Sequence, residues 1–273
     1  MGHKVTGYGL RLCRRNCLRL IGSAAAVAWM GDSVCCAAPA TDRLIEAIGR
    51  GRKFLANLLD PTLDLLPEFQ GSTTYWLYHD NYLAAKVLQK SHPTVAVKIT
   101  TAMRSYSVQA SEKIEILFGE AKEPLPFRHF KLTEVRRIGD KVIKTEVVTE
   151  QVMTGWEEYA DLLLLASIVL DDKAQAQRHL RQALVMWDGM GFKDRAVEKL
   201  DRYATYKLAL ALLAVTKLGE RPPAHESILE RLMAQQSKDG GWITDYDRTG
   251  RTVGLANVET TSLAVLTLDA VTK

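Results

Sequence analysis

The sequence predicts an all-α fold in which about four helical pairs pack in two layers. Segments with apolar residues at helical spacing alternate with loops rich in glycine, proline and acidic residues. In each pair the first helix mixes charged and apolar residues, whereas the second is nearly continuously apolar. A helix that is apolar on all sides is buried on all sides, so we expect the second helices to form an inner layer. The layers would form a ring or an arc.

The first two pairs differ in the length of their loops. The first pair covers 42–90, where Asp60-Pro61 ends the first helix because proline removes a backbone donor. Its inner helix is expected to begin near Tyr78. The second pair begins near Pro93, and its enlarged loop has two β-prone runs around Gly139-Asp140, a typical hairpin turn. We therefore predict a β-hairpin insertion at 131–149.

The last two pairs are more regular. The third has its first helix at 173–187 and its inner helix after Tyr203. Pro222-Pro223 separates it from the fourth pair, whose first helix covers 224–236. The last inner helix is expected to begin near Val258. Because every loop has the same place in its pair, all four loops should emerge at one end of the inner layer.

The first forty residues have the pattern of an export signal. A basic start is followed by an apolar stretch and by Ala38-Pro39-Ala40, which predicts cleavage before Thr41. Arg14-Arg15 resembles the twin-arginine export signal. An uncut membrane anchor is the alternative, although the apolar run is shorter than the ~20 residues of a spanning helix. We expect residues 1–40 to be a signal peptide and 41–273 to be one exported domain, periplasmic or extracellular, with no stable membrane span after processing.

Composition excludes several classes of function. All four cysteines precede residue 41, so the mature chain has no disulfide, no thiolate nucleophile and no cysteine-bound zinc. The charge of +4 comes from the first forty residues, and the neutral remainder gives no support for nucleic-acid binding. Phosphate-binding, zinc-protease and serine-hydrolase motifs are absent from the sequence. We therefore predict no cofactor and no metal site.

One segment resembles a known family. Gln236-Ser237-Lys238-Asp239-Gly240-Gly241-Trp242, followed by Glu259-Thr260-Thr261-Ser262-Leu263-Ala264, resembles the repeat of squalene cyclases and protein prenyltransferases, and 187–192 is a weaker copy. The resemblance implies an α/α toroid of terpenoid-cyclase type, open or small because only four hairpins are present. The sequence departs from these enzymes because it lacks the Asp-x-Asp-Asp tetrad of the cyclases and the zinc-binding cysteine of the prenyltransferases.

Candidate site residues occupy the predicted loop end. Asp80 is the first candidate acid or base, with His79 as its proton partner and Asp245 as a second carboxylate. The alternative for Asp80 is a helix cap. Further acidic and aromatic residues at comparable positions would line the pocket and bind the ligand. These are Trp76, Tyr78, Asp161, Trp187, Tyr203, Trp242 and Glu259.

These observations define the functional expectation. We predict an exported protein that binds or processes a small molecule or glycan in a loop-lined pocket, with carbohydrate favoured because export places the protein among glycans. Catalysis, if present, would use carboxylate acid–base chemistry of the glycosidase or lyase kind. A non-catalytic binding or scaffold protein and an isoprenoid cyclase-like enzyme are the alternatives.

Overall fold

The computed structural model describes residues 40–108, 113–121, 125–198 and 200–273. The predicted signal peptide, up to residue 39, lies outside the described residues. Within them, no helix combines the length and the apolar character that crossing a membrane requires.

The prediction of an all-α fold, and with it the α/α toroid, is wrong. The described residues form eight α-helices together with two three-stranded sheets, so the fold is mixed α/β. The prediction failed because loops that were expected to be irregular pair with one another. Segments of only three to five residues gain their strand conformation from these partners, and such short segments carry no readable periodicity.

Four helices form an inner row that is buried on nearly all sides. Helix α8 packs between α2 and α6, and α6 packs against α4. The two longest bury almost every residue in their first three turns, as expected for helices that are apolar all round. The inner helices are α2 (Leu83–Leu88), α4 (Ala160–Val169), α6 (Thr205–Leu218) and α8 (Val258–Val271).

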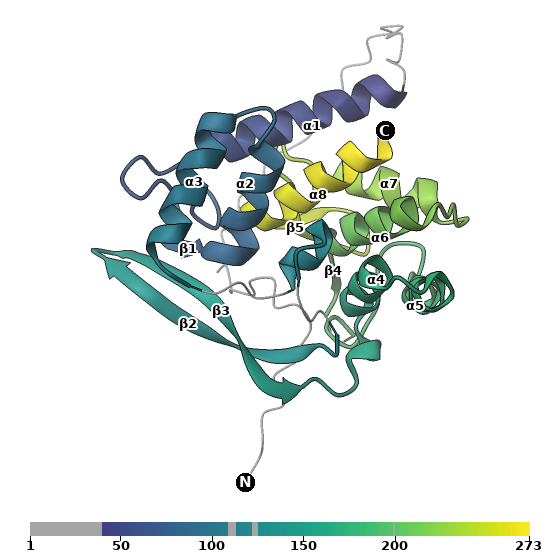
Figure 1. The fold of residues 1–273 in the computed structure, drawn as a ribbon. Coiled ribbons are helices and arrows are strands. Elements are labelled where there is room, and N and C mark those ends of the chain that lie inside the picture. Colours follow the sequence, from purple (N-terminus) through teal and green to yellow (C-terminus); the bar gives the residue numbers. More distant parts are fainter. Residues whose placement is uncertain (1–39, 109–112, 122–124, 199) are drawn as a thin grey trace, which may run out of the picture.

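Each inner helix is covered by one outer helix (Figure 1). The outer helix α1 packs on α8, α3 on α2, α5 on α4 and α7 on α6. The outer helices bury only one stripe each, which in α7 consists of Ile228 and Leu232. The outer helices are α1 (Ala40–Asn57), α3 (Pro93–Ser105), α5 (Lys173–Val185) and α7 (His225–Ala234).

The first sheet, which has one parallel and one antiparallel pair of strands, lies alongside the ends of the inner helices. Strands β2 (Arg128–Ile138) and β3 (Lys141–Val152) form an antiparallel hairpin, and β1 (Thr74–Trp76) pairs with β3 in parallel. The hairpin is somewhat longer than the predicted interval of 131–149. Figure 1 shows it crossing one side of the molecule, with α2 and α3 near one end and α4 near the other. The 3₁₀-helix η2 (Ile114–Phe118) packs against α4.

The second sheet joins the loops of the third and fourth helical pairs. Strand β5 (Ile243–Asp247) pairs antiparallel with β4 (Arg202–Ala204) on one side and with β6 (Thr252–Ala256) on the other. Each inner helix therefore follows a strand: β1 precedes α2, β3 precedes α4, β4 precedes α6 and β6 precedes α8. This order brings the starts of the inner helices next to the sheets.

The segment that resembles the cyclase repeat has a packing role. The Nε2 of Gln236 donates to the carbonyl oxygens of Ala47 and Gly240, at 2.9 and 2.8 Å. Trp242 is fully buried, and its Nε1 donates to the carbonyl oxygen of Leu232 at 2.9 Å. These bonds hold the loop between α7 and α8 against α1. The ring of Trp242 also lies directly against Gly51 of α1.

Two glycines of α1 offer a matched test of this packing. A Cβ at Gly51 would lie 2.7 Å from Val265 Cγ2 and 2.8 Å from Trp242 Cζ3, whereas a Cβ at Gly49 would meet nothing within 4 Å. Gly51→Ala should therefore destabilise the protein by roughly 1–3 kcal/mol through overpacking. Gly49→Ala should stabilise it by roughly 0.5–1 kcal/mol, because alanine favours the helix. Urea unfolding of both variants measures the difference, and equal effects would contradict this packing.

Candidate functional site

Five buried carboxylic side chains meet where the inner helices begin. We call Glu68, Asp80, Glu146, Asp161 and Glu259 the carboxyl cluster. Each is at most 5% exposed. The charges of the other four all act on Glu259, which shows that the five lie close together. They come from the loop before β1, the turn before α2, strand β3, and the first turns of α4 and α8.

The inner helices present three of these carboxyls from equivalent positions. Asp161 and Glu259 are the second residues of α4 and α8. Asp80 lies in η1 (Leu77–Tyr82), a π-helical turn that continues directly into α2. Single π-helical turns are rare and occur frequently at functional sites. No side chain caps η1, so the structure does not support the cap alternative for Asp80.

A buried amide fixes the loop that carries Glu68. The Oδ1 of Asn81 accepts from the backbone N–H of Leu66 at 2.7 Å, and its Nδ2 donates to the carbonyls of Leu66 and Trp76, at 3.0 and 2.8 Å. The carbonyl of Glu68 accepts from the backbone N–H of Val258 at 3.0 Å. These bonds place Glu68 between η1 and the start of α8, beside Asp80 and Glu259.

Asp80 and Glu259 form one half of the cluster, in which the charges that most affect their pKa values are those of other carboxyls. Burial, followed by the charge of Glu68, raises the pKa of Asp80 well above its ordinary value. Burial, followed by the charge of Asp80, does the same to the pKa of Glu259. Asp80 Oδ2 and Glu259 Oε1 have no hydrogen-bond partner among the described residues. Burial and the neighbouring carboxyls therefore favour the protonated form of both groups, and each has an oxygen that receives no hydrogen bond from the described residues.

Cationic groups accompany the other half of the cluster. His79 Nε2 lies 3.0 Å from Glu146 Oε2. Lys113 interacts electrostatically with Glu146 and Asp161, and its burial lowers its pKa to about 8 while these carboxylates oppose that shift. The hydroxyl of Tyr206 donates to Asp161 Oδ2 at 3.0 Å. A positive neighbour stabilises a carboxylate, so this half is suited to holding negative charge.

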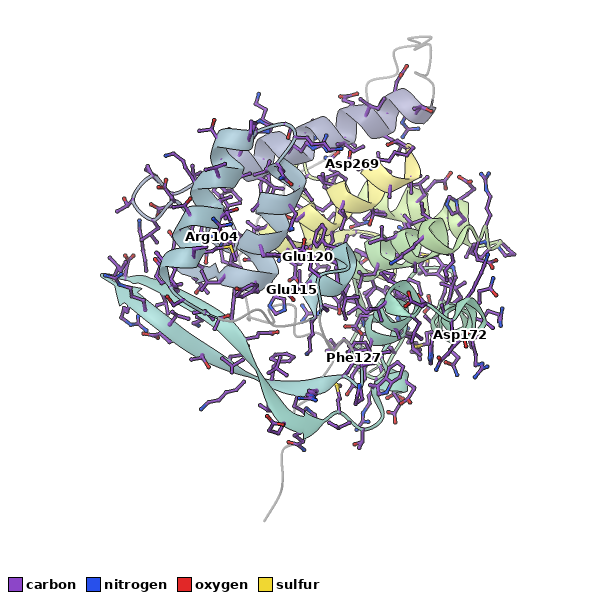
Figure 2. The ribbon with its side chains drawn as sticks, viewed as in Figure 1. Arg104, Glu115, Glu120, Phe127, Asp172 and Asp269 are labelled. Atoms are coloured by element: carbon purple, nitrogen blue, oxygen red, sulfur yellow. The ribbon has the colours of Figure 1, made fainter. Side chains whose placement is uncertain are left out.

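An open cleft of about 630 Å³ lies between the β2–β3 hairpin and the start of α4, and no member of the carboxyl cluster lines it. Phe130 connects the cleft to the cluster, because the ammonium of Lys113 lies 3.6 Å from the centre of its ring. Tyr159 provides a second connection, because it stands two residues before Asp161. Figure 2 shows Glu115, a buried residue of η2, between the helices and the β2–β3 hairpin. The cleft is lined by His129, Phe130, Thr149, Glu150, Gln151, Met153, Thr154, Tyr159 and Arg195.

The segment formed by β1 and η1 carries two further residues that the sequence predicted for the site. Trp76 is buried in β1, and its Nε1 has no partner among the described residues. The ammonium of Lys144 lies 5.5 Å from the Trp76 ring. The hydroxyl of Tyr78 donates to the carbonyl of Val108 at 2.9 Å, and burial, followed by the charge of Glu115, raises its pKa. Trp76 and Tyr78 thus border the residues Asp80 and His79.

The remaining predicted residues have other partners. Asp245 lies in β5, where its Oδ2 is 3.8 Å from a guanidinium nitrogen of Arg202, and it is not among the carboxyls that act on Asp80 or Glu259. The hydroxyl of Tyr203 donates to Asp188, Trp187 packs against Phe192 and Trp242 packs against α1. The structure thus brings Asp80, His79, Asp161 and Glu259 together. Asp245, Tyr203, Trp187 and Trp242 instead make structural contacts.

The sequence interpretation missed several members of the site. Glu68, Glu146 and Lys113 were not singled out, because their positions depend on loop and strand pairing that no periodic pattern reveals. Tyr206 was also missed, although it is the second residue of α6 and so corresponds to Asp161 in α4 and Glu259 in α8. Asp194 was not among the candidate site residues either. It forms a buried ion pair with Lys207 and accepts from the backbone N–H of Ala160 at 2.9 Å, which fixes the start of α4. Within the described ranges, no group of three or more histidine, cysteine, aspartate or glutamate side chains is arranged to hold a metal ion.

Comparison with known proteins found no match among protein families, curated proteins or solved structures.

Replacement of Asn81 tests the bonds that position the cluster. Asn81→Ala removes three buried hydrogen bonds and leaves backbone groups of Leu66 and Trp76 without partners. We expect a loss of roughly 2–4 kcal/mol of unfolding free energy, measured in urea. Gln182→Ala, on the exposed face of α5, is the control and should change stability by no more than about 0.5 kcal/mol. A similarly small change for Asn81→Ala would contradict its positioning role.

The raised pKa values predict how stability depends on pH. Above about pH 4 the unfolded chain releases protons from Asp80 and Glu259 that the folded chain still holds, so stability falls as pH rises. Asp80→Asn and Glu259→Gln should therefore be more stable than the wild type at pH 7, with little difference near pH 4. Each unit by which the pKa is raised corresponds to about 1.4 kcal/mol. Thermal and urea unfolding across this pH range measures the effect.

Asp60 provides a control, because its effect on the pH dependence of stability has the opposite sign. Burial opposes its ionisation, but hydrogen bonds from Lys141 and Tyr75 hold its pKa at about 2. Its contribution to stability is present above about pH 4 and is lost as pH falls through about 2. Asp60→Asn should therefore destabilise the protein at pH 7. If Asp80→Asn behaved as Asp60→Asn does, Asp80 would be an ordinary ionised carboxylate.

Proposed function

We propose that this protein is an acid–base enzyme that uses the carboxyl cluster and acts on a carbohydrate. One observation carries the proposal: Asp80 and Glu259 are buried together, their pKa values are raised by burial and neighbouring carboxyls, and each keeps an oxygen with no hydrogen-bond partner among the described residues. Buried polar atoms normally have partners, so such atoms in one place favour a ligand site. Perturbed pKa values also concentrate at functional sites.

The two halves of the cluster support a division of chemical roles. A carboxylic acid that stays protonated at neutral pH can donate its proton to a leaving oxygen, which is the role we assign to Asp80 or Glu259. We assign the role of base or charge stabiliser to Glu146 and Asp161, because Lys113 interacts electrostatically with both of them. Cleavage of a glycosidic bond uses carboxyl groups in these two states.

The cleft at the β2–β3 hairpin supports a carbohydrate as substrate. Its lining combines the aromatic residues Phe130 and Tyr159 with hydrogen-bonding side chains such as Gln151 and Arg195. Aromatic faces bind the apolar faces of sugar rings, and polar groups bind their hydroxyls. The predicted export of the chain agrees with a glycan substrate. A cleft that binds a glycan without cleaving it would make the protein a non-catalytic binding protein.

Activity measurements on a panel of neutral, acidic and amino-sugar polysaccharides test the proposal. Reducing ends report hydrolysis, and the ultraviolet absorbance of an unsaturated product reports elimination. Asp80→Asn and Glu259→Gln should each lower kcat at least about 100-fold, because general acid–base catalysis contributes at least that factor. Glu157→Gln, an exposed carboxyl just before α4, is the control and should retain full activity. Unchanged turnover in both cluster variants would overturn the proposal.

A further inference from the structure

We propose that the ring of Phe130 is a movable gate between the cleft and the carboxyl cluster, with Lys113 directly behind it. This inference rests on the proposed function, because it names the residue past which a ligand in the cleft would reach the cluster. It follows from the contacts of the ring, from its place on the β2–β3 hairpin, and from its position outside the hydrophobic core.

The ring of Phe130 has neighbours in both the cleft and the cluster. It lines the cleft together with Tyr159. The ammonium of Lys113 lies 3.6 Å from the centre of the ring, close enough for a cation–π attraction. Lys113 in turn interacts electrostatically with Glu146 and Asp161. The contacts that lead from the cleft to these two carboxyls therefore pass through Phe130 and Lys113.

The register of the hairpin places Phe130 on the same face as Glu146. Phe130 of β2 pairs with Val148 of β3, and Glu146 stands two residues before Val148. Residues two apart in a strand project from the same face of the sheet, as do residues that pair directly. Phe130 and Glu146 therefore project from one face, with Phe130 at the end of that face that lines the cleft.

A bulge beside Phe130 shapes the cleft. Arg128 pairs with Val152 and Phe130 pairs with Val148, so one residue of β2 lies opposite three residues of β3, 149–151. All three of these residues line the cleft. Bulges interrupt the ladder of hydrogen bonds and are frequent next to active sites, where they direct side chains. The irregular backbone thus lies at the place where the proposed gate separates cleft and cluster.

The hydrophobic core does not hold the ring of Phe130 in place. Tyr159, on the other side of the cleft, belongs to the core, whereas Phe130 neither belongs to it nor packs against it among the described residues. Phe130 is half-buried, and the contact with Lys113 is a single cation–π interaction of modest strength. A side chain outside a close-packed core can change its rotamer without displacing neighbours, so the ring is able to swing away from Lys113.

Chemical modification of lysines tests the gate without any catalytic turnover. Formaldehyde and a borohydride reductant methylate unprotonated amines, and both are small enough to enter from the cleft. A reaction near pH 8 finds a large share of Lys113 unprotonated, because burial lowers its pKa to about 8. Mass spectrometry of the digested protein then gives the rate of methylation at each lysine.

Two other lysines provide internal references. Lys131 is exposed on the same strand as Phe130 and should react fast in every variant. Lys207 is 1% exposed and is paired with Asp194, so it reacts only when the fold opens widely. In the wild type, Lys113 should react more slowly than Lys131 and at least about tenfold faster than Lys207, because opening of the gate is a local event.

Three variants separate the gate from a general loosening of the hairpin. Phe130→Ala removes the ring and should raise the rate at Lys113 at least about tenfold, with Lys207 unchanged. Phe130→Trp supplies a larger ring with a stronger cation–π attraction and should lower the rate at Lys113 below that of the wild type. Val147→Ala is the matched control and should leave it unchanged, because Val147 is exposed on the opposite face of the hairpin.

The outcomes distinguish the gate from the proposed function. The gate is overturned if Lys113 reacts no faster than Lys207 in the wild type, or if Phe130→Trp leaves its rate unchanged. A rise in Phe130→Ala that Lys207 shares is a loosening of the whole fold, and Phe130→Trp then decides. If the variants behave as expected but no polysaccharide is cleaved, the gate stands and the proposed function fails. If cleavage depends on Asp80 but Lys113 does not respond to Phe130, the proposed function stands and the gate fails.

Discussion

The burial of five carboxyl groups at one place is the constraint on which the rest of the structure depends. An ionised carboxyl in the interior costs several kcal/mol unless it is paired, and several such groups together repel one another. Here burial and neighbouring carboxyls raise the pKa values of Asp80 and Glu259, while Lys113 and His79 accompany Glu146 and Asp161. The apolar inner helices must supply the stability that this arrangement removes, which is the usual relation between a functional site and its scaffold.

The two sheets make the cluster possible by fixing where the inner helices begin. Strand β3 contributes Glu146 directly, and its parallel partner β1 leads into the π-helical turn that carries Asp80. The β2–β3 hairpin also lines the cleft. The site therefore belongs to the combination of helices and strands. Helices alone could present Asp80, Asp161 and Glu259, but neither Glu146 nor the cleft.

The sequence predicted the helical pairs well and the strands poorly. The alternation of amphipathic and apolar segments indicated which helices lie inside, and the repeat gave Asp80, Asp161 and Glu259 equivalent positions, all of which lie in the carboxyl cluster. The three-residue strands β1 and β4 could not be predicted, because they exist only through pairing with distant segments. Glu68 was missed for the same reason, since the bonds of Asn81 and Val258 that place its loop are tertiary contacts.

The residues that carry the cyclase-like resemblance and the residues that carry the proposed chemistry are largely different. Gln236 and Trp242 bind backbone groups and pack against α1, so their pattern reflects how one helical pair closes on another. Of the motif residues, Glu259 alone belongs to the cluster, and its environment is created by carboxyls from four other elements. A repeated motif of this kind follows from the packing of neighbouring pairs, whereas acid–base capacity follows from which charges are buried together. The chemistry of the protein therefore depends on the carboxyl cluster, to which the motif contributes only the position of α8.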